Sequence, residues 1–341
     1  MLEIILLCTV LNSVPEQLEN KNKNNIQTEL NKIQLSGYVQ GRFEWHEDSL
    51  DGVNSLGKPI TTTQFLVRRG RLKAVYSGEL MEGVIQIDAT GSGVSLKDAE
   101  ATFIEPWSGL NLRFTVGQFK YPFGQEILQS SSVREMPERS RIIKTLFPGE
   151  RDRGLRFQIK NSFFNLQSAV VNGNGTQDSL YGANDQNKFK DVVGRLGFDF
   201  KYVILGISGY WGQGLVSKLG DNSEYTKARV GADLSINTSV HVLGNLTLKA
   251  EVVRGTDFQS NPFGFSIIGV QNIGNSFALF SRFDKYDADL GKKNNSIDTI
   301  GGGFHYLFSN NLKGTAVYEH PISEISDLRD DLTTLQLQGM F

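Results

Sequence analysis

Apolar and polar side chains alternate with a period of two in the last ten residues of the chain. Odd-numbered positions carry Leu335, Leu337 and Phe341, and even-numbered positions carry Thr334, Gln336 and Gln338. Successive side chains of a β-strand point to opposite faces, so this period predicts a strand with one apolar and one polar face.

The same alternation recurs along most of the chain, in segments separated by turn residues. It predicts sixteen strands, over 33–46, 62–77, 80–90, 94–105, 110–120, 152–161, 163–172, 190–200, 201–212, 224–236, 242–254, 263–273, 276–286, 296–308, 311–319 and 331–341. Proline is scarce, with 8 residues, and glycine is abundant, with 36. These features favour an all-β fold.

The connections between the predicted strands alternate in length. Those after even-numbered strands are tight, as at 77–79, 200–201, 274–275 and 309–311, and most of those after odd-numbered strands are longer, with 91–93 as the short exception. Short turns at one rim and long loops at the other are typical of outer-membrane barrels. We therefore predict a transmembrane antiparallel β-barrel of about 16 strands in a bacterial outer membrane, surrounded by its lipid, with both termini at the periplasmic rim. A soluble sandwich has no reason to sort its loops in this way.

The polar faces of these strands indicate a wet interior. In 110–120 the apolar face carries Leu112, Phe114 and Val116, while Arg113 and Thr115 lie on the other face. Unpaired buried charge is too costly for a dry core. Sixteen strands are also the number at which a barrel leaves an aqueous channel.

The composition of the chain is compatible with a barrel, and it distinguishes residues 1–32 from the rest. Mean hydropathy is −0.26 and no apolar run approaches the roughly 18 residues of a membrane helix. Residues 1–14 hold a short apolar run around Cys8 and are a candidate remnant of a signal peptide, with a misassigned start as the alternative. Residues 15–32 are polar and predict a solvated periplasmic arm, which leaves 33–341 for the barrel.

The connection 121–151, the third of those that follow odd-numbered strands, is too long for a plain turn and carries aliphatic residues that need burial. These include Ile127, Ile142, Ile143 and Leu146. We expect this loop to fold into the lumen and narrow the pore; the alternative is a solvated extracellular loop. Its basic residues include Arg134, Arg139, Arg141 and Lys144.

Basic residues also recur on the lumen face of one strand. Arg69, Arg71 and Lys73 form a ladder with about 7 Å between rungs, which could pass an anion from site to site. Arg42, Arg113 and Arg156 extend this face, whereas Asp88, Asp98 and Glu100 lie on strands between them. The candidate anion pathway therefore comprises Arg42, Arg69, Arg71, Lys73, Arg113, Arg134, Arg139, Arg141, Lys144 and Arg156.

Several motifs between residues 62 and 158 resemble the phosphate-selective porin O and P family in their order and spacing. They are Arg68-Arg-Gly-Arg-Leu72, Leu96-Lys-Asp-Ala99, Val116-Gly-Gln-Phe119, Phe123-Gly124, Glu126, the serine run from Ser130, Met136 with Glu138-Arg-Ser140, and Arg151-Asp152 before Gly154. The resemblance implies a 16-stranded trimer that passes small anions such as phosphate past an arginine-lined third loop. By this resemblance Arg69 and Arg71 match wall arginines, and Arg139 and Arg141 match the loop. The chain differs from the family pattern in its many loop acids and in lacking a dense lysine cluster.

Small residues and one arginine fall on the predicted outer face of the first four strands. They are Gly37, Gly41, Arg68, Gly70, Ala99 and Ala101. An arginine facing lipid near the membrane centre costs about 2–4 kcal/mol, so a neighbouring subunit explains Arg68 better than lipid does. This predicts a homotrimer interface there; the alternative is a bulge that turns Arg68 into the lumen.

Other classes of function are poorly supported by the sequence. The four histidines have no metal-ligand spacing, no cofactor motif is present, and Gly301-Gly-Gly303 lacks the Lys-Ser/Thr pair of a phosphate loop. The net charge is −2, and basic residues are not clustered with aromatics into a nucleic-acid surface. Three hypotheses remain: an anion-preferring diffusion channel, a weakly selective general porin, and a structural barrel whose lumen is plugged.

Overall fold

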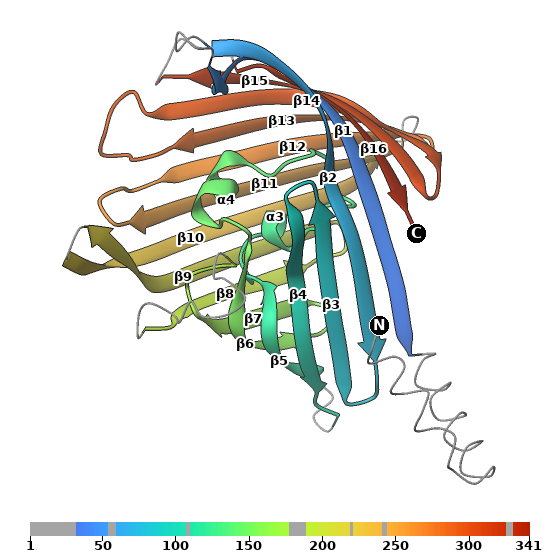
Figure 1. The fold of residues 1–341 in the computed structure, drawn as a ribbon. Coiled ribbons are helices and arrows are strands. Elements are labelled where there is room, and N and C mark those ends of the chain that lie inside the picture. The colour runs from blue at the N-terminus through green and yellow to red at the C-terminus, as the bar shows by residue number, and fades with distance from the viewer. Residues whose placement is uncertain are drawn as a thin grey trace, which may run out of the picture.

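Sixteen antiparallel strands close into one barrel in the part of the chain described by the computed structural model, residues 32–53, 59–106, 110–176, 189–218, 221–240, 244–324 and 330–341 (Figure 1). The predicted fold class is therefore confirmed. The predicted targeting segment and the polar arm up to residue 31 lie outside the described residues. The strands are β1 (Ile33–Val53), β2 (Pro59–Ser77), β3 (Met81–Thr90), β4 (Gly93–Ile104), β5 (Leu112–Lys120), β6 (Arg151–Lys160), β7 (Phe164–Val171), β8 (Asp191–Asp199), β9 (Val203–Lys218), β10 (Asp221–Val240), β11 (Gly244–Asp257), β12 (Phe263–Ile273), β13 (Phe277–Asp287), β14 (Ser296–Ser309), β15 (Leu312–Ser323) and β16 (Leu332–Met340).

The first and last strands close the barrel. Tyr38 of β1 pairs with Met340 of β16, and Gly37 and Phe341 exchange two backbone hydrogen bonds of 2.8 and 3.0 Å. Closure satisfies every strand edge within the sheet, which is what a spanning sheet requires in lipid. The C-terminal strand, followed by the aromatic Phe341, therefore completes the wall.

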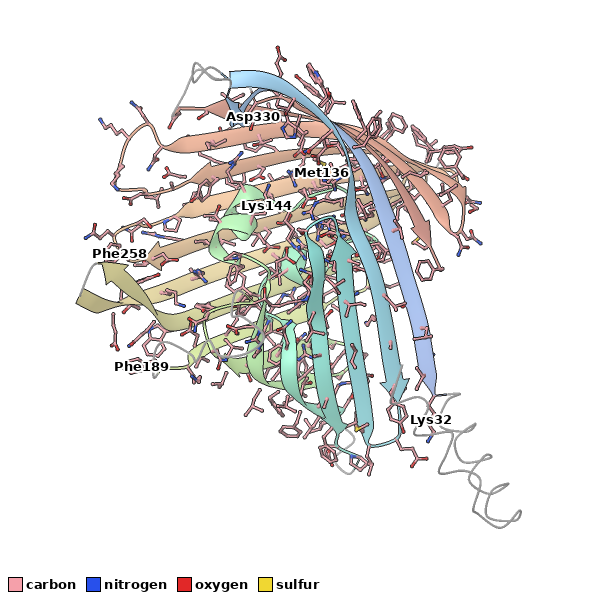
Figure 2. The ribbon with its side chains drawn as sticks, viewed as in Figure 1. Lys32, Met136, Lys144, Phe189, Phe258 and Asp330 are labelled. Carbon is pink, nitrogen blue, oxygen red and sulfur yellow. The ribbon has the colours of Figure 1, made fainter. Side chains whose placement is uncertain are left out.

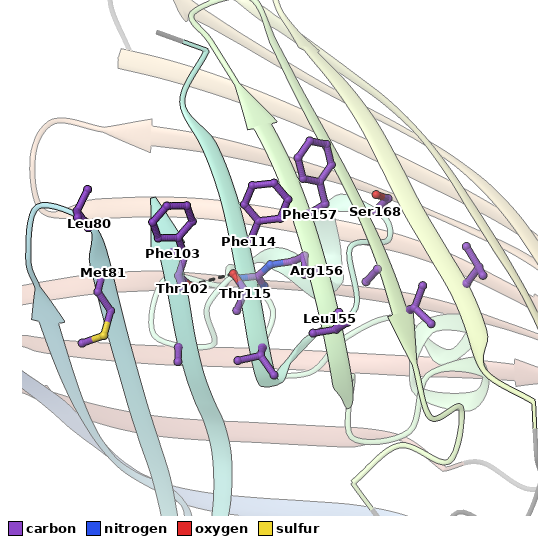
Figure 3. Close-up of a pocket in the computed structure, with 15 residues that line it drawn as sticks. Leu80, Met81, Thr102, Phe103, Phe114, Thr115, Leu155, Arg156, Phe157 and Ser168 are labelled. Carbon is purple, nitrogen blue, oxygen red and sulfur yellow. Dashed lines mark hydrogen bonds between the residues drawn. The ribbon is translucent and has the colours of Figure 1, made fainter. Parts of the chain in front are cut away.

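The outer face of the barrel is apolar, as the alternation predicts. Phe103, Phe114 and Phe157 form a row across β4, β5 and β6, with ring centroids 6.5 and 5.1 Å apart (Figure 3). Behind this row the inward hydroxyls of Thr102 and Thr115 share a hydrogen bond of 2.9 Å. Such a surface matches the hydrocarbon of a membrane.

Two β-bulges change the predicted orientation of side chains on β2 and β4. Gln40 pairs with Arg69 and Gly41 with Val67, so Arg68 is an extra residue on β2; Lys97 is the extra residue on β4. A bulge places neighbouring side chains on one face of the sheet. Arg68 consequently reaches Glu138 inside the barrel, at 2.8 Å, and its predicted outward orientation is wrong.

The other predicted interface residues need one further correction. Gly41, Gly70, Ala99 and Ala101 alternate with inward residues and so lie on the outer face. Gly37 also faces outward, but a Cβ added there would lie 2.6 Å from the ring of Phe341 in the same chain. Phe341 thus covers Gly37 before any second subunit could contact it.

The connection between β5 and β6 folds into the barrel, as predicted. It contains two short helices, α3 (Gln125–Leu128) and α4 (Arg141–Leu146), and both lie inside the ring of strands in Figure 1. Neither these nor any other helix in the described ranges is long and apolar enough to cross a membrane. Residues 121–150 are called the constriction loop from here on.

Gly117 shows how closely the wall is packed beside the start of this loop. Its φ is +131°, and an added Cβ would overlap the carbonyl oxygen of Ala99 on β4. We expect Gly117→Ala to lower the stability of the barrel by about 1–3 kcal/mol. The heat-modifiable mobility of the protein on gels should then be lost at a lower temperature. Gly41→Ala is the matched control, because nothing lies within 4 Å of a Cβ added at Gly41; equal shifts for both variants would contradict this explanation.

Candidate functional site

An aromatic cluster holds the two ends of the constriction loop against the wall. Phe147 is fully buried, and its ring centroid lies 4.6 Å from Phe123, 5.6 Å from Tyr121 and 5.9 Å from Tyr210 of β9. Ile127, Ile142, Ile143 and Leu146 complete the loop's share of this cluster. The aliphatic residues that predicted an inward loop are therefore the ones that attach it.

Polar contacts brace the constriction loop internally. The guanidinium of Arg139 donates to the carbonyl oxygens of Glu126 and Ile127 at 2.9 and 3.1 Å and forms an ion pair with Glu150. The Glu126 carboxylate accepts hydrogen bonds from the backbone N–H and hydroxyl of Ser140. Arg139 is 4% exposed. Its position differs from the expected pathway role, because its donors hold the loop together.

Through Glu138 the constriction loop contacts strands β1 and β2. Its carboxylate contacts Arg68 at 2.8 Å, Arg42 at 3.0 Å and Arg69 at 3.1 Å. Its carbonyl oxygen accepts a hydrogen bond of 2.8 Å from Arg282 of β13. Residue 138 thus connects β1 and β2 with β13, which is separated from β1 by β14–β16 in the ring of strands.

The side chain of Glu138 strongly favours its ionised form. Burial alone would raise the pKa of Glu138, but Arg69, Arg68 and Arg42 together outweigh burial and hold that pKa well below its ordinary value. A carboxylate with a depressed pKa stabilises the folded state above its ordinary pKa, and this contribution is lost as pH falls toward the folded value. The junction should therefore stay intact from neutral pH down through the ordinary carboxyl range.

Three of the predicted wall arginines are matched by acids on nearby strands. Arg71 pairs with Asp88 at 3.1 Å, Arg113 with Glu82 at 2.8 Å, and Arg156 with Glu100 at 2.6 Å. These three arginines therefore belong to ion pairs, in which much of their positive field is cancelled. Sequence periodicity identified the inward arginines but not which acids face them.

Several cations of the wall and loop have no acidic oxygen within 4.0 Å among the described residues. They include Lys73, Lys97, Lys120, Arg134, Arg141, Lys144 and Lys313. Figure 2 shows Lys144 on α4, inside the ring of strands. Burial and the neighbouring Arg139 lower the pKa of Arg134 to about 10, so it remains charged at neutral pH. Four of these cations, Lys73, Arg134, Arg141 and Lys144, belong to the predicted pathway. Lys97 was missed because the alternation of apolar and polar residues does not reveal the bulge on β4.

Acids near the loop that lack a cation within that distance have other donors. Glu251 of β11 accepts the backbone N–H groups of Gln125 and Glu126 at 3.0 and 2.9 Å. Asp152 accepts the hydroxyl of Tyr121 at 3.0 Å and the N–H of Gly173 at 2.7 Å. Both carboxylates therefore accept structural hydrogen bonds, and in Glu251 these go to one oxygen, Oε2. Around the constriction loop, in the part of the chain that the structure describes, cations without an ion-pair partner therefore outnumber acids without one.

A hollow of about 310 Å³ lies between residues 130–132 of the constriction loop and the wall formed by β1, β2 and β3. Its polar lining comprises Ser36, Tyr38, Arg71, Lys73, Gln86, Ser130 and Ser132. Arg71 also donates to the hydroxyl of Ser131 at 2.9 Å. Hydroxyl, amide and cationic donors in one hollow match the acceptor oxygens of a small oxyanion. No group of three His, Cys, Asp or Glu side chains among the described residues is arranged to hold a metal ion.

Comparisons with known proteins agree with this geometry. The sequence model of the family "Phosphate-selective porin O and P" matches residues 38–211, which is more than half of the chain. A search of curated proteins found no match.

Solved porins have similar structures at low sequence identity. The chain is similar to OprB of Pseudomonas putida (TM-score 0.68, 9% identity, covering 92% of this chain and 96% of that one). It is also similar to the outer-membrane channel DcaP of Acinetobacter baumannii (0.67, 14%, 91% and 97%) and to an anion-selective porin from Comamonas acidovorans (0.63, 12%, 91% and 99%). At these identities the likeness establishes the barrel fold.

Proposed function

The chain belongs to the phosphate-selective porin O and P family and forms a channel in the bacterial outer membrane; we propose that this channel passes small solutes by passive diffusion, with a modest preference for anions such as phosphate. Family and fold point to a channel rather than to an enzyme. The observation that carries the anion preference is a group of cations without an acidic oxygen within 4.0 Å in the described part of the chain, among them Lys73, Lys97, Arg134, Arg141 and Lys144, beside acids that accept structural hydrogen bonds.

The size of the preference follows from electrostatics. A unit anion about 4 Å from one cation gains about 4 kcal/mol at an effective dielectric of about 20, before desolvation is subtracted. Salt screens such interactions over about 10 Å at 0.1 M and about 3 Å at 1 M. The preference should therefore be clear at low salt and should fade at high salt.

A weakly selective general porin is the second candidate, and the ion pairs favour it. Arg42, Arg69, Arg71, Arg113 and Arg156 each face a carboxylate, so these five pathway residues add little net charge. The two candidates differ in whether Lys73 and Lys144 control selectivity.

The zero-current potential across a potassium chloride gradient separates these candidates. For the wild type we expect the sign of an anion-preferring channel, and for Lys73→Gln with Lys144→Gln a potential much closer to zero. Lys292→Gln is the control, because the Lys292 side chain is 70% exposed on the connection between β13 and β14. A cation-preferring wild type, or equal potentials for all three proteins, would reject the anion preference.

We also propose that the channel is a homotrimer that associates through the outer face of β1–β4. The support is the small residues Gly41, Ala99 and Ala101, and two apolar hollows of about 740 and 770 Å³ that border this face. Small residues let another barrel approach closely. Native mass spectrometry in mild detergent tests both statements: a monomer rejects the trimer, and a trimer unaffected by Gly41→Leu with Ala101→Leu rejects this interface.

A further inference from the structure

Four glycines of the wall lie directly against apolar side chains of the constriction loop. A Cβ added at each would contact a loop residue: Phe123 at 2.9 Å from Gly231 (β10), Leu146 at 3.4 Å from Gly255 (β11), Ile142 at 2.7 Å from Gly264 (β12), and Met136 at 3.0 Å from Gly301 (β14). At Gly255 the wall residue Pro262 is nearer, at 3.2 Å, and at Gly264 the carbonyl oxygen of Lys285 is equally near. Cβ atoms essentially never approach other heavy atoms within 3.0 Å, so the closest of these contacts leave no room for a side chain.

Three of these glycines have a polar residue at the next inward position, whereas Gly255 has the apolar Val253. The inward residue two positions from Gly231 is Asp233, the one two positions from Gly264 is Ser266, and the one two positions from Gly301 is Thr299. All three are buried. An inward glycine between polar residues forms a socket of the size of the missing side chain. The loop residues that enter the sockets are buried as well, with Phe123 at 0%, Ile142 and Met136 at 1% and Leu146 at 4% exposure.

We infer that Gly231, Gly255, Gly264 and Gly301 form a seat that positions the constriction loop and so sets the width of the solute path; the effect on conductance rests on the proposed channel function. The glycines are positioning residues, since they act through the loop. Their sequence positions lie beyond residues 38–211, the part matched by the family model.

The loop depends on the seat because its own structure is weak. The helices α3 and α4 have 4 and 6 residues, and helices of this length do not persist without packing. The seat lies on β10–β14, and in a closed ring of sixteen strands the arc β2–β6 lies opposite. A bulky side chain on the seat must therefore push the loop toward β2–β6, where Lys73 and Lys97 are located.

The seat can be tested by enlarging a wall glycine to leucine and then shortening the loop side chain that faces it. Gly231→Leu and Gly301→Leu should each lower single-channel conductance by at least about twofold, because a narrower constriction admits fewer ions. Combining them with Phe123→Ala and Met136→Ala, respectively, should restore conductance, since the new wall side chain occupies the volume that the loop has given up. Gly209→Leu on β9 is the control, because nothing lies within 4 Å of a Cβ added at Gly209.

A second readout separates the seat from the channel function. Amide hydrogen exchange of residues 121–150 should be slow in the wild type, faster in each single variant, and slow again in each pair. Single variants with unchanged exchange, or pairs that exchange as fast as the singles, would overturn the seat. A wild type without conductance would overturn the proposed channel and leave the exchange pattern to decide the seat. If a leucine variant fails to fold, Gly301→Ala with and without Met136→Ala gives the same comparison with a smaller change.

Discussion

Glu138→Gln is expected to make the channel markedly more anion-selective and to loosen the constriction loop. The substitution removes the only carboxylate within ion-pair distance of Arg68 and Arg69 in the described part of the chain, and one of two such carboxylates for Arg42. Breaking a buried ion pair by removing one partner costs about 3–5 kcal/mol, and solvent in the lumen will reduce that figure here. The freed guanidiniums should then attract anions.

The measurement for Glu138→Gln is the zero-current potential at low salt, with thermal stability recorded alongside. Glu135→Gln is the matched control, because Glu135 lies on the same loop but pairs with the single cation Lys249. We expect a clearly larger shift toward anions for Glu138→Gln than for its control. A shift toward cations, or equal shifts, would show that the Arg42, Arg68 and Arg69 cluster lies outside the conducting path.

Phe147→Ala is expected to release the constriction loop from the wall while the barrel stays closed. The Phe147 ring is fully buried among Tyr121, Phe123 and Tyr210, and the Arg229 guanidinium lies 4.8 Å from its centroid. Truncating a buried phenylalanine to alanine costs about 3–5 kcal/mol. That cost falls on loop docking, since the backbone hydrogen bonds of the sixteen strands do not involve this side chain.

Two observables follow Phe147→Ala. Amide exchange in 121–150 should accelerate, and single-channel current should rise and become noisier as the loop leaves its position. Phe65→Ala is the control, because Phe65 is 86% exposed on the outer face. Unchanged exchange after Phe147→Ala would mean that the polar contacts of Glu138 and Arg139 hold the loop without the aromatic cluster.

The strands and the inward loop could be predicted because each has a signal in the local sequence. Period-two alternation located the strands, and apolar residues such as Ile142 and Leu146 in a long connection required burial inside the barrel. The C-terminal run of Leu335, Leu337 and Phe341 has the outward orientation that its alternation indicates. These features depend on local order along the chain, which a single sequence contains.

The charge arrangement could not be predicted, because it depends on register between strands and on contacts across the lumen. One extra residue at a bulge turned Arg68 from the outer face to Glu138, and another brought Lys97 into the lumen. Pairing of Arg71 with Asp88 requires knowledge of which residues of β2 and β3 lie opposite. The glycine seat was missed for the same reason, since an inward glycine has no signal until the loop lies on it.

Current through a channel with a single thiol at position 133 tests most directly whether the constriction loop borders the solute path. Val133 is 62% exposed on the loop, whereas Ser140 is fully buried and unsuitable for labelling. In a Cys8→Ser background, a bulky thiol reagent on Val133→Cys should lower the single-channel current by at least about half, because it occupies the constriction. The same reagent on Lys292→Cys should leave the current unchanged. Complete labelling of Val133→Cys with full current would show that the constriction loop does not border the solute path.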